Sequence, residues 1–250
     1  MGPGFRRDSF PLMVKLIDAA ARLSVQVHPD DALARSLSVG ANGKTECWLV
    51  LEDGGELYQG TTPGVDRPAF ERALQEGRVA ETLNHYRPRA GDFFFMKART
   101  VHALGAGCLV YELQQTLDIT FRVWDWGRVG TDGKPRTMHV KEALETIDFG
   151  ASGFGPQRPA WQDQGWQRTL VDGDHFGLQE FNVSEDGDFS GAVNATCAVV
   201  TCLSGEGTLS TRGGAVNLVP GRTAVIPAAA GLFSVDRRVP MHLLVATPKI

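Results

Sequence analysis

The chain has 250 residues, 42% of them hydrophobic, and a formal net charge of −4. This length can bury a substantial core in one large domain or two smaller ones. Acidic and basic residues are mixed along the sequence, so no basic stripe suited to a nucleic-acid backbone is present. No apolar run reaches the length of a membrane span, and residues 1–10 lack the order of a signal peptide. We therefore expect no nucleic-acid partner, no membrane partner and a cytoplasmic location.

Cysteine usage supports the same location. The four cysteines are Cys47, Cys108, Cys197 and Cys202. They form no Cys-x-x-Cys pair and lie mostly among apolar residues, which excludes zinc-finger and thiol redox motifs. We expect them to be reduced and buried, as is typical of a cytosolic protein.

Short strands and short helices alternate through the first half of the chain. Runs rich in β-branched and aromatic residues predict strands at 10–17, 23–28, 45–51, 91–96, 109–114 and 119–124. Helical spacing of apolar residues and helix-start signals predict helices at 30–38, 67–86 and 141–147. The second of these helices is expected to break into two pieces at Gly77.

The stretch 150–167 is rich in Gly, Pro, Gln and Trp and shows no period, which indicates a linker or a wrapping segment. We place the domain boundary there, with domains at 1–150 and 151–250. The second domain contains short strand candidates separated by Gly, Asp and Pro turns, at 176–181, 195–203, 207–211, 216–218, 223–226 and 242–246. Many short, evenly spaced strands predict an all-β sandwich or barrel.

A weak internal repeat links the two halves. The stretch from Gly91 to His102 aligns without gaps with the stretch from Gly221 to Leu232. Both resemble the second cupin signature, in which a glycine, a Pro-x-Gly turn and a histidine follow one another at fixed spacing. The first copy keeps the histidine and the second keeps the proline, so the repeat predicts that only the N-terminal half can hold a metal ion.

One strand candidate has a polar face. Ser24, Gln26 and His28 alternate with apolar residues, so a strand would place the three polar side chains on one side. The backbone positions of Gln26 and His28 would then be about 7 Å apart, close enough for both side chains to reach one ion.

The candidate metal ligands are Gln26, His28, Glu46 and His102. Imidazole nitrogens with carboxylate and amide oxygens suit Zn²⁺ or another divalent first-row metal, and the sequence does not choose among them. Each residue alone carries little weight, since an isolated histidine in a strand is more often structural than a ligand. The set as a whole predicts a metal site.

Several long motifs resemble the short bacterial form of type I mannose-6-phosphate isomerase. They lie at 10–19, 23–31, 43–48, 100–105, 111–115 and 120–126. The resemblance covers essentially the whole chain but weakens after Gly150. It implies a mainly β fold made of two cupin-like jelly-roll barrels with small helical insertions. It also implies interconversion of mannose 6-phosphate and fructose 6-phosphate at a site with one zinc ion, with a sugar phosphate as the partner.

Carried over by residue, the resemblance places the metal ligands at the same four positions, Gln26, His28, Glu46 and His102. It places other active-site residues at Ser24, Lys44, Glu112 and Arg122. Moving a carbonyl between C1 and C2 passes through an enediol, so a base must shuttle a proton while charge on the oxygens is stabilised. We expect Glu112 or a group near it to shuttle the proton. Lys44 and Arg122 would supply positive charge for the phosphate or the enediolate.

The sequence departs from the family in two places. Family members carry a sizeable segment before the Phe-Pro-Leu run, whereas this chain starts almost directly on it. We therefore expect either a truncated or mis-assigned start or a reduced form that closes its sheet differently. The family's Pro-Ala-Gly-Thr turn is Lys97-Ala98-Arg99-Thr100 here. If that turn requires positive φ at the glycine position, Arg99 is strained by about 1 kcal/mol or more.

Two alternatives stay open at this point. One is a non-catalytic or impaired cupin that binds a sugar phosphate and lacks the family's N-terminal segment. The other is a different metal cupin enzyme, such as an iron oxygenase, against which Gln26 and the pairing of Lys44 with Glu46 argue. The C-terminal half is expected to be structural, and the sequence leaves the oligomeric state open.

Overall fold

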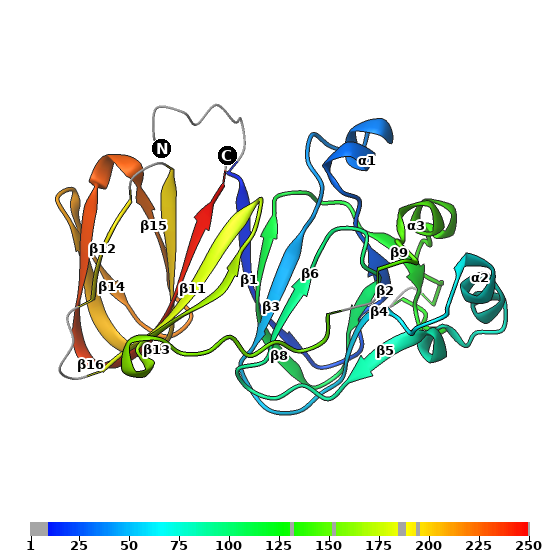
Figure 1. Cartoon of the computed structure of the whole chain (residues 1–250), viewed down its shortest axis with the longest axis horizontal. Coiled ribbons are helices and arrows are strands. Elements are labelled where there is room, and N and C mark those ends of the chain that lie inside the picture. The colour runs from blue at the N-terminus through cyan, green and yellow to red at the C-terminus, as the bar shows by residue number, and fades with distance from the viewer. Residues whose placement is uncertain (1–9, 131–132, 152–153, 185–188, 194–195, 250) are drawn as a thin grey trace. The chain divides into compact units, whose positions relative to one another are not determined.

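The computed structural model describes residues 10–130, 133–151, 154–184, 189–193 and 196–249. The described elements are mainly β-strands with few helices (Figure 1), so the predicted mainly β fold class is confirmed. The chain divides into two compact units. One runs from Leu12 to Arg158, and the other holds the described residues from Pro159 onward together with Phe10 and Pro11. The arrangement as two separate jelly-roll barrels remains a prediction.

The first unit contains a four-stranded antiparallel sheet, here called sheet A. Its strands are β1 (Leu12–Ala19), β8 (Cys108–Gln115), β3 (Glu46–Val50) and β6 (Phe93–Met96), in that order. Glu46 is paired with Gln114, and Glu112 is paired with both Trp48 and Lys15. Directly opposed residues share a face of a sheet, and so do alternate residues of one strand. All five side chains therefore lie on one face of sheet A.

A second antiparallel sheet, sheet B, has five strands. They are β5 (Leu83–Tyr86), β4 (Leu57–Thr61), β7 (His102–Leu104), β2 (Val25–Val27) and β9 (Phe121–Trp124), in that order. Gln26 is paired with both His102 and Arg122, and Gln59 is paired with His102. These four side chains start from the same face of sheet B.

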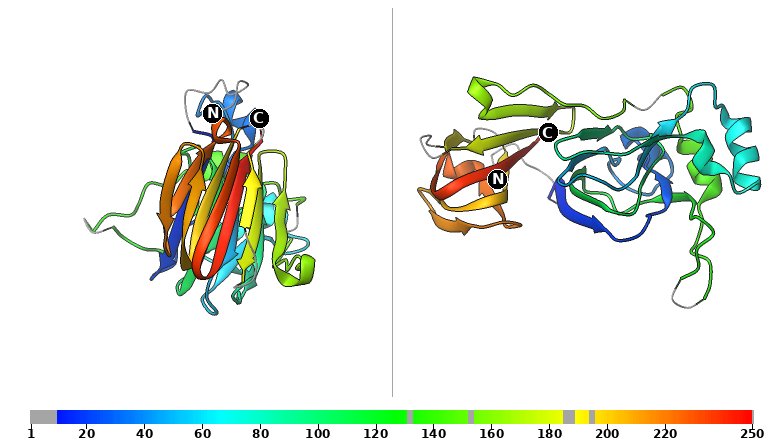
Figure 2. Two further views of the ribbon diagram at one scale, coloured as in Figure 1. Left: turned by 90° about the vertical axis from the view of Figure 1, so that its left-hand side faces the viewer. Right: turned by 90° about the horizontal axis from the view of Figure 1, so that it is seen from below.

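The two faces just described enclose the interior of the first unit (Figure 2). One buried cluster joins Trp48 and Phe94 of sheet A to Leu57 and Leu104 of sheet B. Hydrophobic residues fill this part of the space, whereas the polar residues of both sheets lie at 26, 46, 59, 102, 112 and 114. The interior therefore has an apolar part, which holds the sheets together, and a polar part.

Helices cover the opposite face of sheet B. Val25 and Val27 belong to a second buried cluster with Phe70 of α2 (Arg67–Gln75) and Leu144 of α3 (Val140–Thr146). Because these valines face the helices, Gln26 between them faces sheet A, as the alternation predicted. Two shorter helical elements, α1 (Asp31–Ser36) and the 3₁₀ turn η1 (Val79–Thr82), complete the unit's helices among its described residues.

The predicted helix at 67–86 is wrong in its last part. The helix ends near Gly77, as expected, but residues 83–86 form strand β5. Strand β5 pairs with β4. The sequence did not predict β4, because a run as short as Leu57–Thr61 with a glycine inside gives little signal. Helical spacing continues past the break, but the edge of sheet B offers 83–86 a hydrogen-bonding partner and decides its conformation.

The second unit is built around one seven-stranded antiparallel sheet. Its strands are β10 (Gln167–Asp172), β11 (Phe176–Val183), β12 (Phe189–Ala192), β13 (Cys197–Thr211), β14 (Gly214–Leu218), β15 (Thr223–Pro227) and β16 (Leu232–Pro248). Two candidates predicted at 195–203 and 207–211 are joined in β13, and 242–246 is only the end of the long β16. Residues 194–195 lie outside the described residues. Two further short helical turns flank these strands, η2 (Asp163–Gly165) and η3 (Ala228–Ala230).

The internal repeat corresponds to matching backbone elements. Gly91 and Gly221 both have positive φ, 84° and 81°. Strand β6 begins two residues after Gly91 and β15 begins two residues after Gly221, and His102 and Leu232 each begin the following strand. The two halves thus share a strand-turn-strand unit, in which a histidine of one copy is a leucine in the other.

Two expectations about the class of protein can be compared with the structure. All four cysteines are buried and free, as predicted. Within the described residues, no helix combines the length and apolar character needed to cross a membrane.

Candidate metal centre

Three predicted ligands come together between the two sheets. His28 follows β2, Glu46 begins β3 and His102 begins β7, and their candidate ligand atoms all lie within 4.8 Å of one another. Nε2 of His102 is 3.1 Å from Oε1 of Glu46, and Nε2 of His28 is 3.6 Å from Oε2. All three residues are buried. Sheet B supplies the histidines and sheet A the carboxylate, so only the facing of the sheets makes the cluster.

Backbone carbonyls orient both imidazoles. Nδ1 of His28 donates to the carbonyl of Ile119, and Nδ1 of His102 donates to the carbonyl of Thr100, each at 2.9 Å. A carbonyl can only accept, so in each neutral ring Nδ1 carries the proton and Nε2 keeps its lone pair. The Nε2 atoms that carry these lone pairs are the ring nitrogens nearest Glu46. The carboxylate of Glu46 also has only acceptor atoms. Such an arrangement of acceptors fits a cation among them.

The charges of the cluster also fit a cation. Burial lowers the pKa of His28 well below its ordinary value, so the imidazole is neutral, the form that binds metals. Burial alone would raise the pKa of Glu46, but its neighbours, first among them the ammonium of Lys44, hold it well below its ordinary value. The carboxylate is therefore charged, although neither of its oxygens accepts a well-formed hydrogen bond within the described residues.

The positively charged group next to this cluster is the ammonium of Lys44. Its buried Nζ lies 3.1 Å from Oε2 of Glu46 and 3.2 Å from Nε2 of His28. The two oxygens of Glu46 thus have charged or polar neighbours at ion-pair distance but without hydrogen-bond geometry. The residues at 28, 46 and 102 could hold a metal ion, with Lys44 at its side.

Gln26 and Ser24 lie beside this cluster. Nε2 of Gln26 is 3.3 Å from Nε2 of His102, and the side chain is half-buried. The hydroxyl of Ser24 is buried and donates to Oε1 of Gln26 at 3.5 Å. The structure thus brings Gln26 within reach of the cluster, while Ser24 contacts Gln26 rather than the three central residues.

A close backbone approach fixes the segment that carries Lys44. The backbone N–H of Lys44 donates to the carbonyl of Pro29 at 3.0 Å, directly after His28. A Cβ added at Gly43 would lie only 2.5 Å from the same carbonyl and from the carbonyl carbon of Asp30. Only glycine allows the segments before Lys44 and after His28 to pack this tightly.

Glu112 lies on the inner face of sheet A, two residues along β8 from the position opposite Glu46. Its Oε1 accepts from Nζ of Lys15 at 2.6 Å and its Oε2 accepts from Nε1 of Trp48 at 2.8 Å. Lys15 also donates to Gln114, and 38% of its side chain is exposed. The sequence reasoning missed Lys15, although a single lysine in the apolar run 10–17 is a detectable signal.

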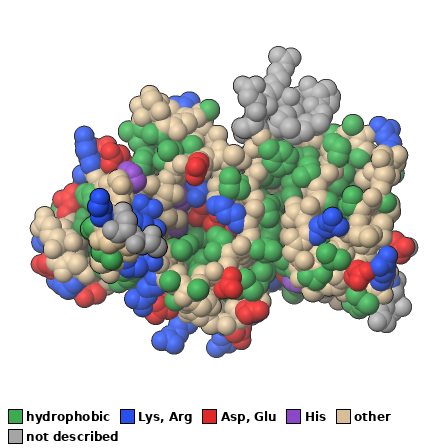
Figure 3. Space-filling model, turned by 180° about the vertical axis from the view of Figure 1, so that it is seen from behind, with side chains coloured by type: hydrophobic (Ala, Val, Ile, Leu, Met, Phe, Trp, Pro, Cys, Tyr) green, Lys and Arg blue, Asp and Glu red, His purple; other side chains and the backbone are tan. Residues whose placement is uncertain are grey.

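Arg122 starts beside Gln26 on the inner face of sheet B. Its guanidinium extends to the rim, where Nη1 donates to the carbonyl of Thr137 at 2.7 Å. Figure 3 shows Lys, Arg, Asp and Glu side chains gathered around a hollowed part of this unit's surface. Arg122 is therefore not one of the three residues of the cluster, and its guanidinium contacts the segment at Thr137.

The turn before His102 has the strained backbone considered from the sequence. Arg99 has a φ of 74°, the left-handed region that glycine adopts most easily. Its N–H donates to the carbonyl of His28 at 2.7 Å and its carbonyl accepts from Asp148 at 3.0 Å. The strain thus occurs in a turn that is hydrogen-bonded to the backbone of a candidate ligand.

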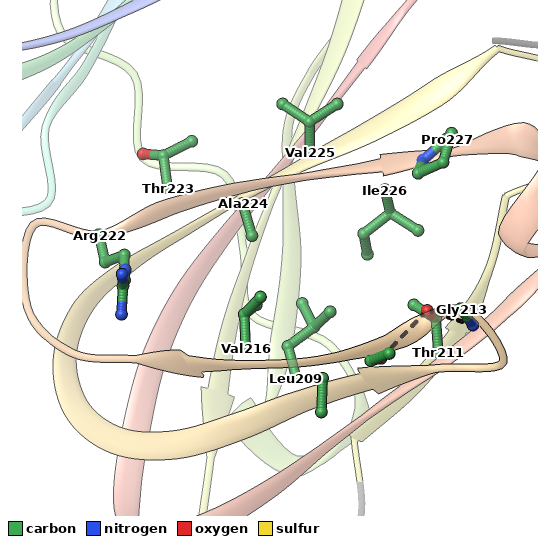
Figure 4. Close-up of a pocket in the computed structure, with 12 residues that line it drawn as sticks. Leu209, Thr211, Gly213, Val216, Arg222, Thr223, Ala224, Val225, Ile226 and Pro227 are labelled. Carbon is green, nitrogen blue, oxygen red and sulfur yellow. Dashed lines mark hydrogen bonds between the residues drawn. The ribbon is translucent and has the colours of Figure 1, made fainter.

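The C-terminal unit has a groove of about 490 Å³ with different chemistry. Its walls include Leu209, Val216, Ala224 and Ile226, with Arg222 at one end (Figure 4). Histidine, cysteine and carboxylate side chains are absent from its described lining, so this groove offers no comparable ligand set.

Known proteins similar in sequence share one family name. A family model described as "Mannose-6-phosphate isomerase, cupin domain" matches residues 167–242. The chain is 33% identical to "Probable mannose-6-phosphate isomerase GmuF" of Bacillus subtilis (strain 168), over 91% of this chain and 72% of that protein. It is 30% identical to "Mannose-6-phosphate isomerase ManA" of the same organism, over 92% of this chain and 73% of that protein.

Solved structures agree with the sequence relatives. The mannose 6-phosphate isomerase of Bacillus subtilis superimposes with a TM-score of 0.86 at 27% identity, covering 98% of this chain and 77% of that one. A putative mannosephosphate isomerase from Archaeoglobus fulgidus shares the fold, with a TM-score of 0.77 at 21% identity over 98% of this chain and 74% of that one. The chain therefore belongs to the mannose-6-phosphate isomerase family, and by that membership it is an isomerase.

Proposed function

We propose that this protein interconverts mannose 6-phosphate and fructose 6-phosphate with the help of one bound divalent metal ion, zinc in the first instance. The observation that carries the proposal is the buried group of His28, Glu46 and His102, whose acceptor atoms face one another. Two imidazoles and a carboxylate suit Zn²⁺. Gln26 would add an amide oxygen once its amide is rotated, because in the structure its nitrogen faces His102 and its oxygen faces Ser24. The names of the relatives supply the substrates.

Zinc in this position would act as a Lewis acid toward the sugar oxygens at C1 and C2. The chain's own residues must then transfer a proton between these carbons through an enediol. Glu112 is our candidate for this step, together with Lys15, whose ammonium contacts one of its oxygens. Trp48 holds the other oxygen, so the carboxylate is fixed in orientation toward the interior.

Lys44 and Arg122 would supply the remaining positive charge. Lys44 is buried beside Glu46 and would face oxygens of the reacting carbons. Arg122 lies nearer the rim, where the substrate's phosphate or the enediolate could meet its guanidinium. Ser24 would orient Gln26. We also propose that the C-terminal half holds no metal ion and that the enzyme acts in the cytoplasm, whose reducing conditions fit four free, buried cysteines.

The test is a coupled assay of the purified protein after zinc loading. Mannose 6-phosphate should be converted, chelation should abolish the conversion, and restored zinc should recover it. Metal content measured in parallel should be one ion per chain, and it should fall in His102→Ala. Calorimetric binding of mannose 6-phosphate without any turnover would overturn the isomerase proposal and support a binding protein.

A second candidate follows from the same donor set. Two histidines and one carboxylate also hold iron(II) in non-haem oxygenases. The membership of the isomerase family and the ammonium of Lys44 beside Glu46 favour the isomerase. Consumption of O₂ that depends on Fe²⁺, in the absence of isomerisation, would instead support the oxygenase.

A further inference from the structure

A buried carboxylate directly after strand β9 joins two arginines. Asp125 is 5% exposed, and Nε of Arg136 donates to its Oδ2 at 2.7 Å. Nη2 of Arg136 and Nη2 of Arg128 both donate to Oδ1 of Asp125. The paired contact of Arg136 has the two-point geometry that fixes a guanidinium against a carboxylate. Asp125 therefore anchors the segment that carries Arg136 to the end of β9.

The segment that carries Arg136 makes hydrogen bonds with the candidate active-site residue Arg122 on β9. The N–H of His139 donates to the carbonyl of Arg122 at 2.8 Å, so the segment after Arg136 runs back beside β9. Nη1 of Arg122 donates to the carbonyl of Thr137, the residue next to Arg136. Nε of Arg122 is buried without an acceptor in the described part of the chain. The orientation of the guanidinium thus depends strongly on the place of the Thr137 carbonyl.

The charges of these groups also link Asp125 to Arg122. Burial lowers the pKa of Arg122, Arg136 and Arg128 lower it further, and Asp125 opposes them. Three guanidinium groups close together repel one another unless a carboxylate compensates. Asp125 is the carboxylate that contacts two of them. Loss of its charge would therefore favour movement of these groups apart.

We propose that Asp125 is a positioning residue for the isomerase reaction, acting through Arg136 and the Thr137 carbonyl to aim the guanidinium of Arg122 at an anionic oxygen of the substrate. This inference rests on the proposed function only for the identity of that oxygen. The oxygen belongs either to the phosphate group or to the enediolate. If the oxygen belongs to the phosphate, misorientation of the Arg122 guanidinium should raise KM. If it belongs to the enediolate, the same misorientation should lower kcat.

The test is a double-mutant cycle with Asp125→Asn and Arg122→Lys. Asp92 offers a matched control, because it is a buried aspartate of the same unit whose oxygen accepts from Nε of Arg158 at 2.6 Å. Asp125→Asn should lower kcat/KM by about 10- to 100-fold, whereas Asp92→Asn should leave it unchanged. In the Arg122→Lys background, Asp125→Asn should cause little further loss, since both changes remove the same interaction.

A second readout does not need turnover. Arginine side-chain ¹⁵N relaxation should show a rigid Arg122 in the wild type and in Asp92→Asn, and a mobile one in Asp125→Asn. Additive kinetic losses, or a rigid Arg122 in Asp125→Asn, would overturn the proposal. If no variant isomerises mannose 6-phosphate but Asp125→Asn still releases Arg122, the proposed function fails while the positioning of the guanidinium stands.

Discussion

The two copies of the strand-turn-strand unit share the order of strand, turn and strand but differ in the residue that begins the second strand. In the first unit, the strand after the turn begins with His102, which is buried beside Glu46. In the second unit, the strand after the matching turn begins with Leu232, which is 74% exposed. The comparison teaches that this order of elements does not create a metal site. Among the described residues, histidine, cysteine and carboxylate side chains come together as a candidate metal site in the first unit alone.

The largest effect expected from this comparison is the loss of His102, one of the proposed ligands. His102→Ala should lower bound zinc and reduce isomerase activity by more than about 100-fold, because even residues that only support a ligand cost 10- to 100-fold. Leu232→Ala, the matching change in the second unit, should alter neither quantity. Metal analysis and the coupled assay measure both. Equal losses in the two variants would contradict the assignment of the metal to the first unit.

A second large effect is expected at Gly43, where Cβ has no space. Gly43→Ala should destabilise the protein by about 2 to 4 kcal/mol and weaken zinc binding, since the backbone that carries His28 and Lys44 must shift. A Cβ added at Gly213 in the second unit would lie 3.7 Å from Oγ1 of Thr211, an ordinary van der Waals contact. Gly213→Ala should therefore change the free energy of unfolding by less than about 0.5 kcal/mol. Urea unfolding and zinc titration compare the two; unchanged zinc affinity in Gly43→Ala would contradict the role of this close approach.

Arg99 and Ala229 occupy aligned positions in the two turns but have different backbones. Arg99 has positive φ, whereas Ala229 lies in the 3₁₀ turn η3 and does not. Arg99→Gly should raise the free energy of unfolding by up to about 1 kcal/mol through relief of strain. Ala229→Gly should lower it by about 0.5 to 1 kcal/mol, because glycine only adds freedom to the unfolded chain. Thermal unfolding should show shifts of opposite sign, and shifts of the same sign would contradict this explanation.

The smallest effect concerns the buried acid of the second unit. Burial alone would raise the pKa of Glu180, but hydrogen bonds from His242 and Arg168 lower it below its ordinary value of 4.5. A carboxylate whose pKa is lower in the folded state stabilises the fold above its unfolded pKa and loses this contribution as the pH falls through the folded value. The stability of the protein should therefore decline below pH 4.5, and less steeply in Glu180→Gln. Urea unfolding at decreasing pH measures the slope.

The exposed Glu206 provides the control for this slope. Its carboxylate pairs with Arg238 at the surface, with 46% of its side chain exposed. Exposed ion pairs contribute little to stability, so Glu206→Gln should keep the wild-type slope. The same reduction of slope in both variants would contradict a specific role for Glu180.

Local sequence patterns determined much of this protein. Alternation of polar and apolar residues predicted that Ser24, Gln26 and His28 share a face, and Val25 and Val27 do pack on the opposite side of β2. Strands β3, β6 and β8 were predicted because their runs are rich in β-branched and aromatic residues and are bounded by turn residues. The resemblance of long motifs to mannose-6-phosphate isomerases was confirmed by relatives in sequence and in structure.

Only the tertiary structure decided the remaining features. Residues 83–86 became a strand because the edge of β4 offered hydrogen bonds, which helical spacing in the sequence does not reveal. Glu46 approaches His102 because sheets A and B face each other across a shared core. Lys15 and Asp125 acquire their partners in the same way, through chain segments brought together by folding. The sequence by itself determined which side chains could bind a metal ion, and the facing of the two sheets decided where they meet.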